Sequence, residues 1–294
     1  MNNTLTEQRN YAPELIQQQA VTFIEQNKSN PFFLYLAYTL PHAALQLPAA
    51  DPVFEHYKKK FKEQPKTIRK DWNGTGYQPQ AYPHAAYAAM VTKLDNCVGE
   101  VVARLKQLGL DKNTMIIFTS DNGPHKEGGN EPAFFNSSAG FRGIKRQLSE
   151  GGIREPMIVS WPGKIKARQV SNHVGAFWDF MPTFAELTGQ ILQGHTDGLS
   201  ILPILLNKGQ QQQHEFLYWE FHEDGGRQAV RMDKWKGIRE KAINNPDGTI
   251  ALYDLGKDPG ETKNLASVFP EVVSKIRKIM QNEHTEHKDF PFFN

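Results

Sequence analysis

The segment Met115–His125 contains the residues with the clearest potential for chemistry, because an apolar run there ends at Asp121-Asn122-Gly123. Such a run is typical of a buried strand, and α/β sheets bind ligands just beyond the carboxyl ends of their strands. Asp121 and Asn122 offer two adjacent oxygen ligands for a hard cation such as Ca²⁺ or Mg²⁺. Asp-Asn-Gly is also an ordinary turn sequence, and taken alone it favours a turn.

Two further polar residues follow or precede apolar runs in the same way. His42 comes after the run 31–38, and Lys145 lies in the glycine-rich segment 141–156 that leads into a third run. We therefore expect His42, Lys145 and Asp121 to meet at one edge of a sheet. The alternatives are that His42 is a loop or capping histidine and that Lys145 belongs to a solvated basic cluster.

The elements that must position these residues follow from the apolar pattern. Residues 13–27 and 85–108 have apolar residues at helical spacing, and Gly109 marks the end of the second helix. The continuous apolar run 31–38 predicts a strand buried on both faces, and 43–80 predicts an irregular excursion. This order of helices and strands favours an α/β fold with a parallel or mixed sheet.

The second half of the chain predicts a change of architecture. Residues 156–163 predict another short buried strand, 178–187 a helix, and the Gln-rich stretch 208–213 a surface linker. A small antiparallel sheet and a final helix over 270–284 are expected beyond the linker. Its strand-like runs are 216–221, 228–232, 234–239 and 250–255. We therefore predict two domains, 1–207 and 208–294.

Composition excludes several classes of protein. The 294 residues carry a net charge of only +2 with both signs interspersed, so no nucleic-acid partner is expected. No run reaches the roughly 18 apolar residues of a membrane span. Cys97 is the single cysteine, which excludes an internal disulfide, and its helical position predicts a buried core residue. The N-terminus does not have the pattern of a secretory signal.

Three stretches give the chain a resemblance to a known family: PFFLYLAYTLPH (31–42), residues 87–125 around TSDNGPH, and FRGIKRQLSEGGIREPMIVSWPGKI (141–165). In this order they resemble the type I sulfatases of the alkaline-phosphatase-like superfamily, in particular the arylsulfatase A and N-acetylgalactosamine-6-sulfatase branch. The tail, 218–239 and 252–266, is similar to the C-terminal subdomain of bacterial members. The resemblance implies a mixed sheet flanked by helices, followed by a small antiparallel sheet.

The resemblance also implies roles for individual residues. Asp121 and Asn122 would be two ligands of an active-site Ca²⁺, with Mg²⁺ as an alternative. Lys145 would hold the sulfate, and His42 would contact the ester and protonate the leaving group. These roles make chemical sense, because a cation, a lysine and an imidazolium stabilise the charge that develops when a sulfate ester is cleaved. Further candidates for substrate contacts are His125, Arg142, His222 and Arg227.

The sequence departs from the family in one respect. The family's C/S-x-P-x-R motif, which matures to a formylglycine nucleophile, and its early aspartate pair are not found before Pro31. Ser160-Trp161-Pro162-Gly163-Lys164 resembles the motif but lies in the family's late WPGKI segment, and Cys97 has the wrong neighbours. The chain therefore looks like the C-terminal part of a sulfatase.

This departure leads to several expectations. The chain alone would bind Ca²⁺ weakly, because two ligands are too few for Ca²⁺. It would have no turnover, because the nucleophile and the aspartate pair are not found. Apolar faces and strand edges would be exposed, so the isolated chain would either aggregate or pair with a separately encoded N-terminal sulfatase segment. The substrate would be a sulfated carbohydrate or an aryl sulfate. The alternatives are a phosphoryl or phosphonate hydrolase of the same superfamily and a catalytically dead carbohydrate-binding or scaffold module. The family implies a periplasmic or secreted location.

Overall fold

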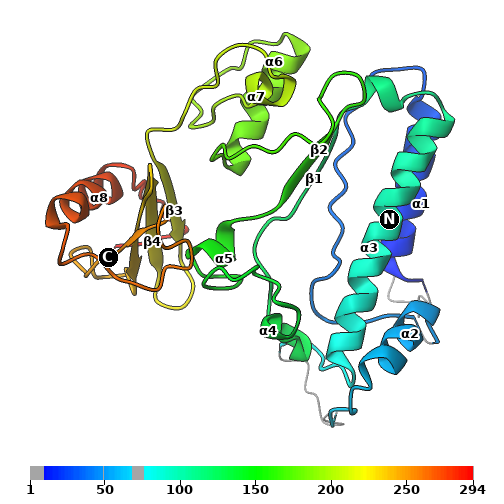
Figure 1. Ribbon diagram of the computed structural model, residues 1–294, viewed down its shortest axis with the longest axis horizontal. Coiled ribbons are helices and arrows are strands. Elements are labelled where there is room, and N and C mark those ends of the chain that lie inside the picture. The colour runs from blue at the N-terminus through cyan, green and yellow to red at the C-terminus, as the bar shows by residue number, and fades with distance from the viewer. Residues whose placement is uncertain (1–9, 49, 68–75, 294) are drawn as a thin grey trace. The chain divides into compact units, whose positions relative to one another are not determined.

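A computed structural model describes residues 10–48, 50–67 and 76–293, so part of the predicted 43–80 excursion lies outside the described residues. The chain forms two compact units (Figure 1). The first holds the described residues up to Met115 together with His125–Phe135, and the second holds Ile116–Pro124 and Asn136–Asn294. The predicted boundary between residues 207 and 208 falls inside the second unit and stays a prediction.

Two long helices form the body of the first unit. They are α1 (Ala12–Asn27) and α3 (Pro83–Gln107), which lie side by side in Figure 1 and agree with the predicted helices. The Gln17 amide of α1 donates to the Glu100 carboxylate of α3 at 2.7 Å. Cys97 is only half-buried and lines a groove of about 450 Å³ between these helices, so the prediction of a core cysteine is wrong. Because the helices touch along only part of their length, the groove leaves the thiol partly accessible.

A helix inside the predicted excursion was missed. It is α2 (Pro52–Phe61), and its N-cap residue Asp51 accepts hydrogen bonds from the backbone N–H groups of Val53 and Phe54, both at 3.0 Å. Asp followed by Pro is a recognised start of a helix, because proline suits the first helical position. The sequence therefore contains this Asp-Pro start signal, but the many Lys and Gln residues around it led to the prediction of an irregular segment.

The segment 31–38 is extended but pairs with no strand among the described residues, so the prediction of a sheet strand buried on both faces is wrong. Its side chains alternate between half-buried and exposed, and the Tyr35 side chain is 76% exposed. An extended backbone buries both faces only when sheet neighbours and covering layers are present on each side. In the described residues one face of this segment packs on the unit and the other faces outward.

The first strand pair belongs to the second unit. Strands β1 (Ile116–Thr119) and β2 (Met157–Ser160) pair antiparallel, with Ile116 opposite Ser160 and Thr119 opposite Met157. Both strands were predicted, but β2 is not buried, because Ile158 is 63% exposed. The short helical segments of the two units are η1 (Asp111–Asn113), η2 (Glu127–Gly129), α4 (Pro132–Phe135), α5 (Glu150–Ile153), η3 (Phe177–Asp179), α6 (Phe180–Thr188) and α7 (Leu202–Leu206).

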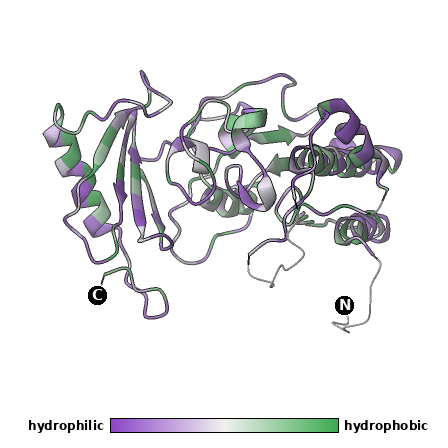
Figure 2. Ribbon diagram, turned by 90° about the horizontal axis from the view of Figure 1, so that it is seen from below, coloured by the Kyte–Doolittle hydropathy of each residue, from purple (hydrophilic) through white to green (hydrophobic). Residues whose placement is uncertain are grey.

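The C-terminal sheet and its helix are confirmed. The antiparallel strands, in the order β3-β4-β5-β6, are β3 (Leu217–Phe221), β4 (Arg227–Met232), β5 (Trp235–Glu240) and β6 (Ala251–Asp254). The final helix α8 (Pro270–Asn282) packs Ile276 and Met280 against Val230 and Leu252. Figure 2 shows both hydrophobic and hydrophilic residues on α8, and its apolar residues pack on the sheet, as expected of an amphipathic helix.

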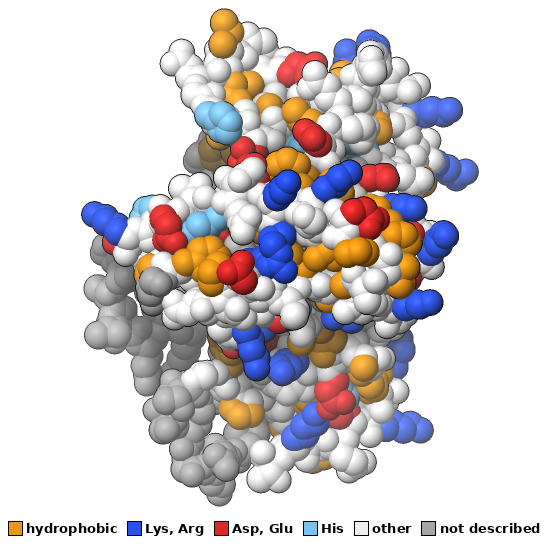
Figure 3. Space-filling view, turned by 90° about the vertical axis from the view of Figure 1, so that its left-hand side faces the viewer, with side chains coloured by type: hydrophobic (Ala, Val, Ile, Leu, Met, Phe, Trp, Pro, Cys, Tyr) orange, Lys and Arg blue, Asp and Glu red, His pale blue; other side chains and the backbone are white. Residues whose placement is uncertain are grey.

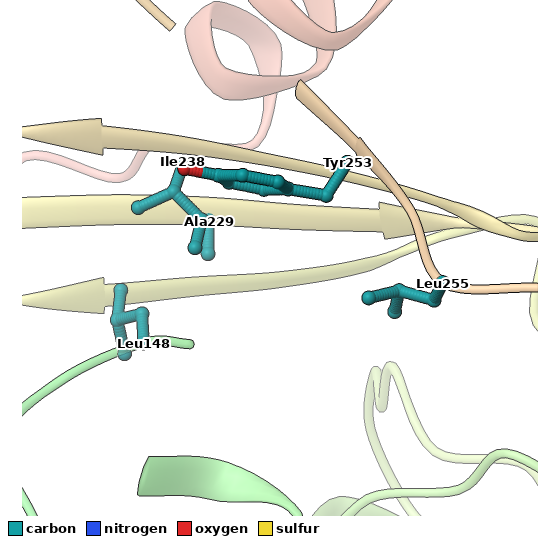
Figure 4. Packing of buried hydrophobic residues seen from close by; sticks show 5 residues of the cluster. All are labelled: Leu148, Ala229, Ile238, Tyr253 and Leu255. Atoms are coloured by element: carbon teal, nitrogen blue, oxygen red, sulfur yellow. The ribbon is translucent and has the colours of Figure 1, made fainter. Parts of the chain in front are cut away.

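The opposite face of this sheet packs on the glycine-rich loop instead of a helix. Leu148, two residues before α5, faces Ala229 and Ile238 of the sheet, with Tyr253 and Leu255 completing the cluster (Figure 4). The sheet is therefore sandwiched between α8 and the segment that carries Lys145. On the face drawn in Figure 3, basic and acidic side chains are interspersed. No helix among the described residues is long and apolar enough to span a membrane.

The first prediction concerns His284, just after α8. Its Nδ1 lies 2.7 Å from Glu220 and its Nε2 lies 2.9 Å from Glu286. Burial lowers the pKa of His284, but these two carboxylates outweigh burial and raise the pKa above 6.5. A raised folded-state pKa stabilises the fold below pH 6.5, and this stability is lost as the pH rises through the folded-state value.

We expect the replacement His284→Gln to flatten the decline in the free energy of unfolding between pH 6.5 and 8.5. Urea titrations at several pH values measure this, and His195→Gln provides a control because His195 is largely exposed. An unchanged slope in the His284 variant would contradict the assigned role.

Candidate functional site

Asp121 and Asn122 lie directly after β1, as predicted. Asp121 is exposed, and its carboxylate has no hydrogen bond or ion pair among the residues that the structure describes. The half-buried Asn122 donates from Nδ2 to the carbonyl of Gly123 at 3.1 Å, and Ser120 Oγ donates to the Asn122 carbonyl at 3.1 Å. The turn is therefore held by its own polar groups, while Asp121 itself is exposed.

A second carboxylate, Glu155, lies near Asp121 and was missed by the sequence analysis. Thr119 pairs with Met157, so the residues two positions beyond this antiparallel pair are Asp121 and Glu155. Burial, and then the charge of Asp121, raise the pKa of Glu155 to about 7. Its Oε1 is buried without a hydrogen-bond partner among the described residues. Only the antiparallel register, which the sequence did not reveal, brings the two carboxylates together.

These groups fit part of a divalent-cation site. Two neighbouring carboxylates repel each other, and a cation between them would remove the repulsion and satisfy the orphaned Glu155 oxygen. The described residues contain no cluster of three or more His, Cys, Asp or Glu side chains placed to hold a metal. Asp121, Asn122 and Glu155 thus offer fewer oxygen groups than the six to eight that Ca²⁺ takes, roughly half of a full set.

Lys145 is tied to this turn through the backbone. The Lys145 N–H donates to the Pro124 carbonyl at 3.0 Å, and the Gly123 N–H donates to the Gly152 carbonyl at 3.0 Å. A Cβ atom on Gly123 would overlap the carbonyl oxygen of Gly151, so this close approach requires glycine. The structure therefore places Asp121, Asn122 and the half-buried Lys145 on two loops that are bonded to each other.

Two predicted substrate contacts belong to the same region and contact the Lys145 loop. The Arg142 guanidinium stacks over the Tyr253 ring at 4.7 Å. Arg227 donates from Nη1 to the carbonyl of Arg146 at 2.9 Å and pairs with Glu240 at 2.7 Å. Arg227 thus supports the residue next to Lys145. A direct contact of Arg142 or Arg227 with substrate stays a prediction.

His222 lies elsewhere in the second unit. Its Nε2 is 3.0 Å from the carbonyl oxygen of Phe290, and its ring packs on Phe292 at 4.9 Å. The imidazole is thus part of an aromatic cluster formed by the C-terminal tail. The structure brings it into no contact with the Lys145 loop, within the residues described, and its role toward substrate stays a prediction.

His42 and His125 belong to the first unit and lie together. The rings are 5.6 Å apart, and His42 Nδ1 is 2.5 Å from the Ala43 carbonyl oxygen. His125 is 6% exposed, with Nε2 2.9 Å from the Pro41 carbonyl oxygen and Nδ1 3.2 Å from the Glu127 carboxylate. Both ring nitrogens of His125 therefore face oxygen atoms, and one of these belongs to the residue that precedes His42. The geometry makes His125 a support for the His42 loop.

The Asp121-Asn122 turn, named the cation turn for the oxygen ligands that it offers, and the bonded Lys145 loop, named the lysine loop, lie in the second unit. The His42–His125 pair lies in the first unit. The sulfatase family matches residues 1–190, and the C-terminal family of N-sulphoglucosamine sulphohydrolase matches residues 141–288. The chain belongs to the sulfatase family, and its fold is of the alkaline-phosphatase-like type.

Known relatives agree with this membership. The steryl-sulfatase of Rattus norvegicus is 33% identical over 300 residues, covering 90% of this chain and 46% of the relative. The N-acetylgalactosamine-6-sulfatase of Mus musculus is 32% identical over 307 residues, covering 92% and 52%. The crystal structure of Ps i-CgsB with k-i-k-neocarrahexaose superposes with a TM-score of 0.74 at 26% identity, covering 96% of this chain and 56% of that one. The chain spans about half the length of the curated relatives that it matches.

The second prediction tests the contact between the two loops. Gly123→Ala forces the new methyl group into the Gly151 carbonyl, so we expect a loss of about 1–3 kcal/mol in the free energy of unfolding from overpacking. Gly99→Ala is the matched control, because nothing lies within 4 Å of its Cβ position in α3. There we expect a gain of about 0.5–1 kcal/mol from helix propensity. Urea unfolding of both variants measures the difference, and equal stabilities would contradict the contact.

Proposed function

We propose that the chain carries the metal-binding and sulfate-binding part of a site that hydrolyses sulfate esters of carbohydrates. The observation that carries this proposal is the pair of backbone hydrogen bonds, Gly123 to Gly152 and Lys145 to Pro124, that joins the Asp121-Asn122 turn to the Lys145 loop. Family membership supports the reaction class. The named relative that acts on N-acetylgalactosamine 6-sulfate and the oligosaccharide complex of Ps i-CgsB support a sulfated sugar as substrate.

The chain's own residues suit this chemistry. Asp121 and Asn122 would hold a Ca²⁺ ion, with Glu155 beside them, and the ion would supply positive charge to the sulfate oxygens. Lys145 would add a second positive charge at the same group. With Nδ1 of His42 donating to the Ala43 carbonyl, Nε2 is the nitrogen that would give a proton to the departing alkoxide oxygen.

The nucleophile is not supplied by any residue that we can identify in this sequence. The family's formylglycine motif is not found before Pro31, and Ser160 of the similar S-x-P-x-K sequence ends the exposed strand β2. We therefore propose that the chain alone binds Ca²⁺ weakly and has no turnover, and that an N-terminal sulfatase segment completes the site. The exposed face of 31–38 supports this partner, because an extended, outward-facing apolar segment suits the addition of a neighbouring strand.

The third prediction concerns the cation. If Ca²⁺ binds the Asp121 turn with a Kd of about 1 mM, 10 mM Ca²⁺ raises the free energy of unfolding by about 1.4 kcal/mol. We expect Asp121→Ala to abolish this increase. The exposed Asp197→Ala variant should retain it. Urea titrations with and without Ca²⁺ measure the effect, and an equal increase in both variants would remove Asp121 from the site.

The fourth prediction concerns turnover. We expect the DNA upstream of Met1 to encode a C/S-x-P-x-R motif, and the chain expressed with that segment to hydrolyse an aryl sulfate. Lys145→Ala should lower the rate by about 100-fold through the loss of sulfate stabilisation. Lys164→Ala is the matched control, because Lys164 is exposed and lies outside the Lys145 loop, in the S-x-P-x-K sequence that begins at Ser160. This replacement should leave the rate unchanged.

The other functions give different results in the same assay. Turnover by the purified chain without the upstream segment would contradict the proposed inactivity. Faster hydrolysis of the aryl phosphate than of the aryl sulfate would identify a phosphoryl hydrolase. Binding of a sulfated oligosaccharide without turnover, even with the upstream segment present, would identify a binding module.

A further inference from the structure

A buried ion cluster lies between the C-terminal sheet and α5. Arg231 of β4 and Lys236 of β5 are directly opposite each other in the sheet register and project from the same face. Two like charges at such a pair repel each other. Glu150 lies against both of them, with Oε1 2.8 Å from Lys236 Nζ and Oε2 3.5 Å from Arg231 Nη1. The side chain of Lys236 is 0% exposed and that of Glu150 is 3% exposed, so the cluster is shielded from solvent.

A second carboxylate, that of Glu261, holds the backbone of Glu150. Glu261, which is 2% exposed, accepts a hydrogen bond from the Glu150 N–H at 2.8 Å. The Arg142 Nε lies 3.8 Å from the same Glu261 oxygen. Glu150 is thus held through its side chain by the sheet and through its backbone by the loop after β6, and Arg142 joins the cluster at its edge.

Stability alone does not account for this arrangement. Burial lowers the pKa of Lys236, while Lys236 holds the pKa of Glu150 below its usual value against the effect of burial. The contact between Glu150 and Lys236 is desolvated, and an apolar pair of similar volume is often as stable as a buried ion pair or more stable. What the buried ion pair provides in addition is a defined position, because the two Glu150 oxygens are held by Lys236 on one side and by Arg231 and Arg154 on the other.

That position is transmitted to the candidate site by short contacts. The Gly151 N–H donates to the Arg142 carbonyl at 2.7 Å, and the Gly152 carbonyl accepts from Gly123 next to Asn122. Cβ atoms on Gly151 or Gly152 would overlap loop carbonyl oxygens, so these contacts leave little room for adjustment. A displacement of Glu150 therefore displaces both the Lys145 loop and its contact with the cation turn.

We propose that Lys236 is a positioning residue for sulfate binding: through Glu150 it sets the place of α5, and thereby of Lys145, relative to Gly123. The inference rests on the proposed function for its consequence, since it assigns Lys145 to the sulfate. Its structural part stands on the contacts of Lys236, Glu150 and Gly123 alone.

The test compares two buried cations of β5 in the full chain. Lys236→Met removes the cation that holds Glu150. Arg239→Met is the matched control, because Arg239 is 1% exposed on the opposite face of the strand and binds Gln228 at 2.8 Å. Both variants lose a buried positive charge, but of the two replaced residues only Lys236 contacts α5. Amide hydrogen exchange of Lys145 and Gly123, normalised to the amides of β5, and the affinity for inorganic sulfate are measured in each.

We expect Lys236→Met to accelerate the normalised exchange of both amides and to weaken sulfate binding by about tenfold, the size of effect seen when a supporting residue is lost. Lys236→Arg should keep the exchange rates and the sulfate affinity close to those of the unaltered chain. Arg239→Met should change neither quantity. The double variant Lys236→Met/Glu150→Gln removes both charges of the pair and keeps an amide oxygen as an acceptor for the partly exposed Arg231, so it should fold and still show the faster exchange.

Unchanged exchange in the double variant, or equal acceleration in Arg239→Met, would overturn the proposal. If the unaltered chain binds no sulfate, the sulfate assignment of Lys145 fails while the exchange data still decide whether Lys236 positions the loop. Failure of the proposed function and failure of this inference are thus separate results.

Discussion

The close contact between Gly123 and α5 is the constraint on which the candidate site depends. At this contact the backbone of the cation turn passes so near the carbonyl of Gly151 that no side chain fits. The Gly123 N–H donates to the Gly152 carbonyl, and the carbonyl of the next residue, Pro124, accepts from the Lys145 N–H. Because backbone groups make these bonds, the spacing between Asp121 and Lys145 does not depend on flexible side chains. The backbone therefore sets the distance between the two loops, and the candidate side chains are held on this backbone frame.

The C-terminal sheet has a part in the site that its position in the chain does not suggest. One face is covered by α8 in the ordinary way, through Ile276 and Met280. The other face receives Leu148 and the buried carboxylate of Glu150, while Arg227 reaches the carbonyl of Arg146. The loop that carries Lys145 therefore packs on this face of the sheet. Each inner strand of this sheet is paired on both sides, which makes the sheet a suitable support for the Lys145 loop.

The sequence predicted the elements that rest on local patterns, and it failed where long-range pairing decides. The two long helices, the four strands of the C-terminal sheet and the final helix were all predicted, because periodicity and turn residues are local signals. The segment 31–38 was wrongly predicted as a paired, buried strand, since an apolar run does not say whether neighbours are present. Asp121, Asn122 and Lys145 were identified from motifs, but Glu155 and Lys236 were not. Glu155 depends on the register of β1 with β2, and Lys236 reads as an ordinary charged residue in a strand until its buried partner is known.

The predicted residues are divided between the two units of the chain. His42 and His125 form a supported pair in the first unit, whereas the cation turn and the lysine loop belong to the second. The chain connects the two directly, because Pro124, whose carbonyl holds Lys145, is followed by His125, whose ring contacts the loop of His42. These two consecutive residues therefore each support a different catalytic candidate. Because these two supports are consecutive in the chain, a change in the backbone at Pro124 or His125 acts on the Lys145 loop in one unit and on the His42 loop in the other.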